Sequence, residues 1–216
     1  MSLRSILRAA LPVAALAVLG MTMAAPAAAA GDPVRGKTLG WTCLGCHGIE
    51  TYKNVYPTYS VPKLRGQHAE YIVAALKAYR TGDRSHGTMH AQAASLSDQD
   101  IDDISAYLAG QPVTADANAT PVGTAPAAVA TCQACHGTVG VGIVEMYPTL
   151  SGQHADYLEY ALESYRNGTR KNGLMEPFAT QLKPEDIKVI ADFYSKQRPT
   201  LYTVPLKEQV PQTAAR

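Results

Sequence analysis

A repeated unit accounts for most of the 216 residues, and it limits the folds open to this chain more than any other feature of the sequence. Residues 62–101 align without gaps on residues 148–187 at a shift of 86 positions, and 19 of the 40 aligned positions are identical. A Cys-x-x-Cys-His motif also occurs once in each half, at 43–47 and 132–136, a shift of 89. The first half therefore has three extra residues after its motif, which a loop can absorb at little cost. Such self-similarity predicts two copies of one folding unit, related by internal duplication.

Each motif places two thiols and an imidazole together on one helical turn. Residues i, i+3 and i+4 share a helix face, so Cys43 and Cys46 can present their sulfurs to the two vinyl groups of one porphyrin. His47 then lies beneath the ring, with its imidazole toward the iron. The second motif offers the same groups on Cys132, Cys135 and His136. This is the attachment signature of c-type haem, and the sequence predicts two covalently bound haems, each with a histidine as one axial ligand.

Other uses of paired cysteines fit the pattern less well. A thioredoxin-like dithiol needs a strand before the motif, and none is predicted there. A zinc ribbon uses two cysteine pairs about 15–20 residues apart, whereas most of a domain separates these pairs. Structural disulfides would leave the histidine after each pair unexplained.

The opposite axial ligand is expected at the same repeat position in both halves. Met89 and Met175 are aligned, 42 and 39 residues after their motif histidines, and the difference equals the three-residue insertion. Met146 has no repeated partner and is expected to be a packing residue. His68 and His154 also repeat and are the alternative ligands, although each lies at the predicted start of a helix. Met/His ligation raises the reduction potential and fills both axial positions of the iron. An iron with no open position cannot bind a substrate, so the sequence predicts an electron carrier with no catalytic residue, and not an enzyme.

Helical spacing dominates both halves and predicts an all-α fold with long loops. The first helix of the repeat spans 67–81 and ends at Gly82. A second helix begins after Ser97, in a capping-type sequence, and ends at Gly110. Its counterpart in the second half has Pro184 in its first turn. The apolar faces are expected at Tyr71, Ala74, Ala75, Ala78 and Tyr79, at Ile101, Ile104 and Leu108, and at Ile187, Ile190 and Tyr194. We find no run of alternating strand pattern.

The first thirty residues are typical of a secretory signal peptide. Arg4 and Arg8 precede an apolar stretch, and the small-residue run 24–30 suits cleavage after Ala30. An uncleaved membrane anchor is the alternative, since about 20 apolar residues can span a bilayer. The predicted division is 1–30 signal peptide, 31–111 first domain, 112–125 Pro/Ala-rich linker, 126–200 second domain and 201–216 C-terminal tail.

The charge balance argues against nucleic acid as a partner. After removal of residues 1–30 the chain keeps 17 Lys+Arg against 18 Asp+Glu, and no basic patch is evident. Export predicts a periplasmic location.

On these motifs the chain resembles the dihaem cytochrome c4 family, whose members join two class I cytochrome c domains through a linker. The resemblance covers the whole mature sequence, including the Pro-x-Leu-x-Gly segments at 62–66 and 148–152. It implies that each proline carbonyl accepts a hydrogen bond from the proximal histidine of its half. The residues so implied are Pro62 for His47, Pro148 for His136, Leu64 and Leu150 against the haem faces, and Tyr79, Arg80, Arg84, Tyr165, Arg166 and Arg170 near the propionates.

The resemblance also implies a role. Members of this family shuttle electrons in the periplasm from a quinol-oxidising respiratory complex to a terminal haem–copper oxidase. Redox proteins are therefore the expected partners, and no small-molecule substrate is expected. The alternative is a dihaem electron-accepting subunit of a periplasmic dehydrogenase, such as a flavocytochrome sulfide dehydrogenase. A dihaem peroxidase would need a displaceable ligand, and the paired methionines argue against it.

Overall fold

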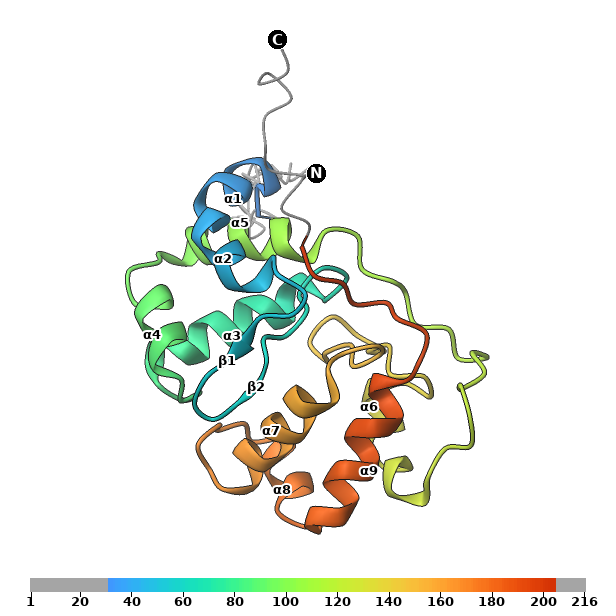
Figure 1. The fold of residues 1–216 in the computed structure, drawn as a ribbon. Helices are drawn as coiled ribbons and strands as arrows, with labels where there is room; N and C mark the ends of the chain where they lie inside the picture. Colours follow the sequence, from blue (N-terminus) through green and yellow to red (C-terminus); the bar gives the residue numbers. More distant parts are fainter. Residues whose placement is uncertain (1–30, 205–216) are drawn as a thin grey trace, which may run out of the picture.

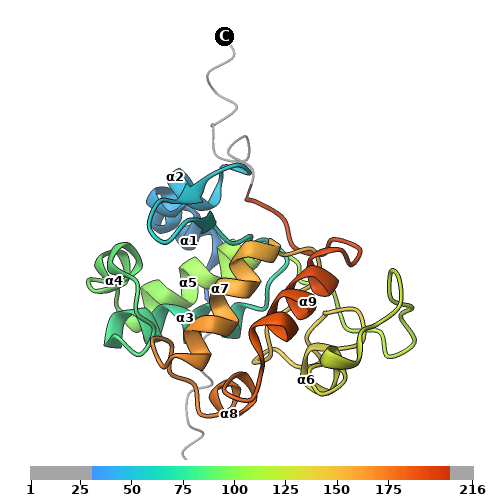
Figure 2. The same cartoon turned by 60° about the horizontal axis from the view of Figure 1, so that its bottom comes forward.

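A computed structural model describes residues 31–204, which are mostly helical (Figures 1 and 2). The predicted signal peptide and the end of the predicted tail lie outside the described residues. The first half contains α1 (Pro33–Leu39), η1 (Gly40–Cys43), α2 (Leu44–His47), β1 (Lys53–Asn54), β2 (Tyr59–Ser60), α3 (Ala69–Thr81), α4 (Gly87–Ala93) and α5 (Asp98–Ala109). The second contains η2 (Ala127–Val129), α6 (Gln133–His136), α7 (Ala155–Arg166), α8 (Met175–Ala179) and α9 (Pro184–Ser195). Within residues 31–204, no helix has the length and apolarity needed to cross a membrane.

The closing helix of each half follows the sequence prediction. The Ser97 hydroxyl accepts the backbone N–H of Asp100, and the Asp100 carboxylate accepts the N–H of Ser97, so α5 begins with a capping box. Pro184 occupies the first turn of α9. All predicted apolar positions of these two helices are buried, namely Ile101, Ile104, Leu108, Ile187, Ile190 and Tyr194.

The predicted apolar face of α3 was partly wrong. The helix ends at Gly82, which adopts the left-handed conformation at φ 87° as a C-cap requires. Its buried side chains are Ile72, Leu76 and Tyr79, an i, i+4, i+7 stripe that packs against α4 and α5. Ala74 is exposed. The buried face is rotated about the helix axis relative to the predicted one. Burying the large side chains removes more apolar surface from water than burying the alanines, and so stabilises the fold more.

A short hairpin occupies the segment where the first half has its extra residues. Strands β1 and β2 pair antiparallel, with Lys53 opposite Ser60, although no strand was predicted. The hairpin contacts the second half: the ring of Tyr59 stacks on Tyr160 with centroids 4.1 Å apart. The Asp156 carboxylate at the start of α7 accepts the backbone N–H of Ser60 at 3.0 Å. The insertion is therefore part of the contact between the halves.

The chain crosses between the halves again at its C-terminal end. Tyr202 pairs with Arg65 of the first half through backbone hydrogen bonds of 2.9 and 3.0 Å. Leu201 and Val204 are both 0% exposed, and Val204 belongs to the core cluster of the first half. The start of the predicted C-terminal tail 201–216 therefore packs against the rest of the chain and buries Leu201 and Val204.

The predicted linker 112–125 passes outside the second half without helix or strand (Figure 1). It is held by Gln197, which is 2% exposed. The side-chain Oε1 of Gln197 accepts the N–H of Val122 at 2.8 Å, and its Nε2 donates to the Val122 carbonyl at 3.2 Å.

Gly36 allows the closest approach of α1 to α5. A Cβ at this position would lie 1.9 Å from the carbonyl oxygen of Asp103, so Gly36→Ala must push the helices apart. We expect a loss of about 1–3 kcal/mol in the free energy of unfolding, measured by thermal unfolding of the haem-loaded protein. Gly87→Ala is the matched control, because no atom lies within 4 Å of its Cβ. Equal stability of the two variants would contradict this packing.

Candidate haem-binding sites

The two Cys-x-x-Cys-His motifs form short helical turns near the N-terminal end of each half. Cys43 closes η1, and Cys46 and His47 lie in α2. Cys132 precedes α6, and the N–H of His136 donates to its carbonyl at 2.9 Å. All four cysteines, Cys43, Cys46, Cys132 and Cys135, are half-buried, and none of them forms a disulfide. Among residues 31–204, no group of three or more His, Cys, Asp and Glu side chains could hold a metal ion.

The motif histidines are fixed by backbone carbonyls. Nδ1 of His47 lies 2.9 Å from the Pro62 carbonyl oxygen, and Nδ1 of His136 lies 2.8 Å from that of Pro148. A carbonyl only accepts, so Nδ1 carries the proton and Nε2 keeps a free lone pair. Burial lowers the pKa of both imidazoles, which keeps them neutral and able to bind a metal.

Both predicted methionine ligands lie at the start of a short helix. Met89 is half-buried in α4 and packs against the first-half core, as do Cys43 and Leu64. Met175 begins α8 and is also half-buried. In the second half, Leu150 and Cys132 pack against the core cluster that includes Val129 and Tyr194.

Two side chains that the sequence analysis did not single out accept hydrogen bonds from the backbone N–H groups of these methionines. The N–H of Met89 donates to Nδ1 of His86 at 3.1 Å, and the N–H of Met175 donates to Oδ1 of Asn172 at 2.9 Å. His86 and Asn172 are aligned in the repeat. Their different side chains hide the shared role, although both can accept a hydrogen bond.

The alternative ligands, His68 and His154, are the N-cap residues of α3 and α7. His68 is 7% exposed, and its Nε2 lies 3.3 Å from the carbonyl oxygen of Gly142 in the other half. His154 is half-buried. His68 therefore lies at the boundary between the halves.

Arg84 and Arg170 meet at this boundary. Their backbones form an antiparallel bridge, and they are 8% and 7% exposed. Each guanidinium donates to a tyrosine hydroxyl of the opposite half, Arg84 to Tyr157 at 2.7 Å and Arg170 to Tyr71 at 2.8 Å. The guanidinium carbons also lie 4.4 and 4.3 Å from the ring centroids of Tyr79 and Tyr165.

These two buried cations have no carboxylate partner within 4.0 Å among residues 31–204. Burying an unpaired charge costs free energy, so an anion bound near these two guanidinium groups would stabilise the boundary. Burial of Tyr71 alone would raise its pKa, but the charges of Arg170 and Arg84 outweigh it and bring the pKa to about 7. Haem propionates would supply the missing negative charge, and the donor set of this chain therefore fits the group.

The other two arginines predicted near the propionates, Arg80 and Arg166, are engaged within their own halves. Arg80 donates to the Leu96 carbonyl at 2.8 Å and pairs with Asp98 at 2.5 Å. Arg166 pairs with Glu163 at 3.0 Å.

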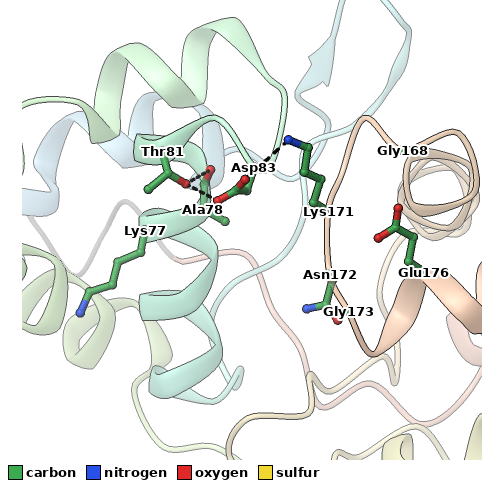
Figure 3. A pocket seen from close by; sticks show the side chains of 9 residues that line it. All are labelled: Lys77, Ala78, Thr81, Asp83, Gly168, Lys171, Asn172, Gly173 and Glu176. Carbon is green, nitrogen blue, oxygen red and sulfur yellow. Dashed lines mark hydrogen bonds and ion pairs between the residues drawn. The ribbon is translucent and has the colours of Figure 1, made fainter.

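A groove of about 500 Å³ lies at the outer edge of this boundary (Figure 3). Its charged side chains include Lys77 and Asp83 from the first half and Lys171 and Glu176 from the second. Asp83 and Lys171 face one another across it at 3.9 Å. None of the residues that line it is a predicted haem ligand, although Asn172, which accepts the N–H of Met175, is among them.

Comparison with known proteins agrees with two haem domains. The family model described as cytochrome c matches residues 33–111, and the model described as cytochrome c oxidase, cbb3-type, subunit III matches residues 124–193. Cytochrome c4 of Pseudomonas aeruginosa is 34% identical over 84% of this chain and 95% of its own length. A thiosulfate dehydrogenase electron acceptor of Stutzerimonas stutzeri is 31% identical over 85% of this chain and 93% of its own length.

Solved structures give the same picture. Reduced recombinant cytochrome c4 from Pseudomonas stutzeri superposes with a TM-score of 0.61 at 29% identity, over 78% of this chain and all of the other. Thiosulfate dehydrogenase from Marichromatium purpuratum gives a TM-score of 0.62 at 25% identity, over 83% of this chain and 44% of the other. The two Cys-x-x-Cys-His motifs are thus haem c sites in tandem cytochrome c domains.

Proposed function

The chain belongs to the cytochrome c4 family, and on that premise we propose that it carries electrons through the periplasm from a quinol-oxidising respiratory complex to a terminal haem–copper oxidase. It is a dihaem electron carrier and not an enzyme, and redox proteins are its partners. The observation that carries the proposal is the paired site: each half joins a haem c motif to a carbonyl-supported histidine and a capped methionine. Two such sites packed against one another suit the passage of single electrons.

The proposed iron ligands are His47 and Met89 in the first half and His136 and Met175 in the second. The free Nε2 lone pair of each histidine supports the assignment, as does the capping of each methionine N–H. Bound haem iron supplies a one-electron couple, and a thioether ligand raises its potential. The chain's own part is to fill both axial positions and limit contact with water. Leu64 and Leu150 are proposed to pack on the haem faces, with Arg84 and Arg170 as partners of the propionates.

We further propose that the halves arose by duplication, because 19 of 40 aligned positions are identical. The proposed division remains 31–111, a linker 112–125, and 126–200, followed by the tail 201–216. Residues 1–30 are proposed to be a signal peptide that directs the chain to the periplasm and is then removed.

A second candidate function is electron acceptance from a thiosulfate dehydrogenase. Relatives named as electron acceptors of that enzyme match over most of this chain, and this favours it over the flavocytochrome sulfide dehydrogenase suggested by the sequence. The two roles differ in what reduces the haems.

The test is to purify the exported protein and to supply each reductant in turn. A freely diffusing carrier will elute alone, be reduced by membranes given quinol, and be reoxidised by membranes containing the oxidase. Co-elution in fixed proportion with a dehydrogenase, with reduction by thiosulfate and not by quinol, would contradict the primary proposal and support the second.

A further inference from the structure

Two buried glutamines at aligned positions reach across the boundary between the halves. Gln67 and Gln153 are 3% and 4% exposed. The Gln67 side chain pairs with the backbone of Thr149: the Thr149 N–H donates to Oε1 at 2.9 Å, and Nε2 donates to the Thr149 carbonyl at 3.0 Å. Gln153 pairs in the same way with Lys63, both bonds being 3.0 Å. Each glutamine side chain therefore pairs with both the N–H and the carbonyl of one residue in the opposite half, as the backbone of a neighbouring β-strand does.

In the second half, the peptide held by Gln67 is the one that supports the histidine. The peptide group joining Pro148 to Thr149 gives its N–H to Gln67 and accepts Nδ1–H of His136 at 2.8 Å on its carbonyl. One peptide group thus links a glutamine of the first half to the proximal histidine of the second.

The first half has the reciprocal arrangement. The peptide group joining Pro62 to Lys63 gives its N–H to Gln153 and accepts Nδ1–H of His47 at 2.9 Å. The connections are therefore crossed, because each histidine is supported through the glutamine of the other half.

A hydrogen bond at a peptide N–H polarises the carbonyl of the same peptide, by roughly 10–30% per bond in a hydrogen-bonded chain. A stronger carbonyl acceptor draws the Nδ1 proton away from the imidazole and makes Nε2 more basic. A more basic ligand stabilises ferric over ferrous iron and lowers the reduction potential. Loss of the glutamine therefore raises the potential of the haem in the opposite half.

We propose that Gln67 and Gln153 are reciprocal positioning residues, each of which lowers the reduction potential of the haem held by the other half. The inference rests on the ligands His47 and His136 assigned under the proposed function. Its consequence is that both potentials depend on the docking of the two halves.

The test is a redox titration of the dihaem protein carrying Gln67→Leu or Gln153→Leu. Gln67→Leu is expected to raise the ferrous-to-ferric ratio of the second-half haem about two- to tenfold at a fixed potential, the upper value corresponding to ~59 mV for one electron. The first-half haem should not move. Gln153→Leu should shift the first-half haem alone. Met175→Ala, which alters only the second haem, assigns the two waves.

Gln197→Leu is the matched control. Gln197 is equally buried and holds the backbone of Val122 by the same pair of bonds, but that peptide supports no histidine. It should lose stability without shifting either potential. If a leucine variant does not fold, Gln67→Asn withdraws the amide by one methylene and should shift the same haem in the same direction.

A shift in the mutated half alone, equal shifts in both haems, or no shift would overturn the inference while leaving the proposed function intact. Absence of the methionine–iron charge-transfer band in the unmutated protein would instead contradict the proposed ligands Met89 and Met175, whatever the glutamine variants do.

Discussion

The exported protein carrying Cys43→Ala and Cys46→Ala will hold one haem instead of two, and its first half will not fold. No thiol remains there to form a thioether, so the mass will fall by one haem beyond the change in side chains. Most of the roughly 5–15 kcal/mol that holds a domain together is expected to be lost. Mass spectrometry and thermal unfolding measure the two effects.

The first half is expected to depend on this prosthetic group because its described core holds aliphatic and tyrosine side chains but no phenylalanine or tryptophan. Both phenylalanines of the chain, Phe178 and Phe193, lie in the second half, and the single tryptophan, Trp41, is 59% exposed. Gly45→Ala is the control: it lies between the cysteines, and no atom lies within 4 Å of its Cβ, so two haems should remain. Two haems on the double-cysteine variant would contradict attachment at this motif.

Met175→Ala is expected to leave the second-half iron with five ligands and to lower its potential by on the order of 0.1 V or more, within the ~0.8 V that axial ligands span. The thioether favours ferrous iron, so its loss favours ferric iron. The charge-transfer band of the methionine–iron bond should fall to half its amplitude. A redox titration followed by absorption gives both readings.

Met146→Leu is the control for this variant. Met146 was expected to be a packing residue, but it is 67% exposed. It has no counterpart in the repeat, so both potentials and the band should stay unchanged. If Met175→Ala behaved in the same way, His154 would return as the candidate ligand.

The sequence predicted well those features that depend on local pattern. The helix from Ser97 to Gly110 follows from a capping box and one apolar face, and both are present. The haem c motifs follow from residue spacing alone. The hairpin at 53–60 was missed because strands of two residues carry no periodicity.

Contacts between the halves could not be predicted, because they depend on how two finished units pack. Tyr71 counted as an apolar position of α3, yet its hydroxyl accepts a hydrogen bond from Arg170 of the other half. The alignment of the repeats showed that Gln67 and Gln153 are identical, but the sequence alone did not indicate what either side chain contacts. The buried Val204 lies in the segment 201–216, which the sequence assigned only to a C-terminal tail.

The amplitude of the methionine–iron charge-transfer band per haem, in the oxidised exported protein, tests the central claim most directly. Two haems per chain with a full band for each are expected, because we propose that each iron lies between a histidine and a methionine. A band that accounts for one haem or none would show an open or differently ligated iron, and would contradict the assignment of this chain as a carrier with two closed sites.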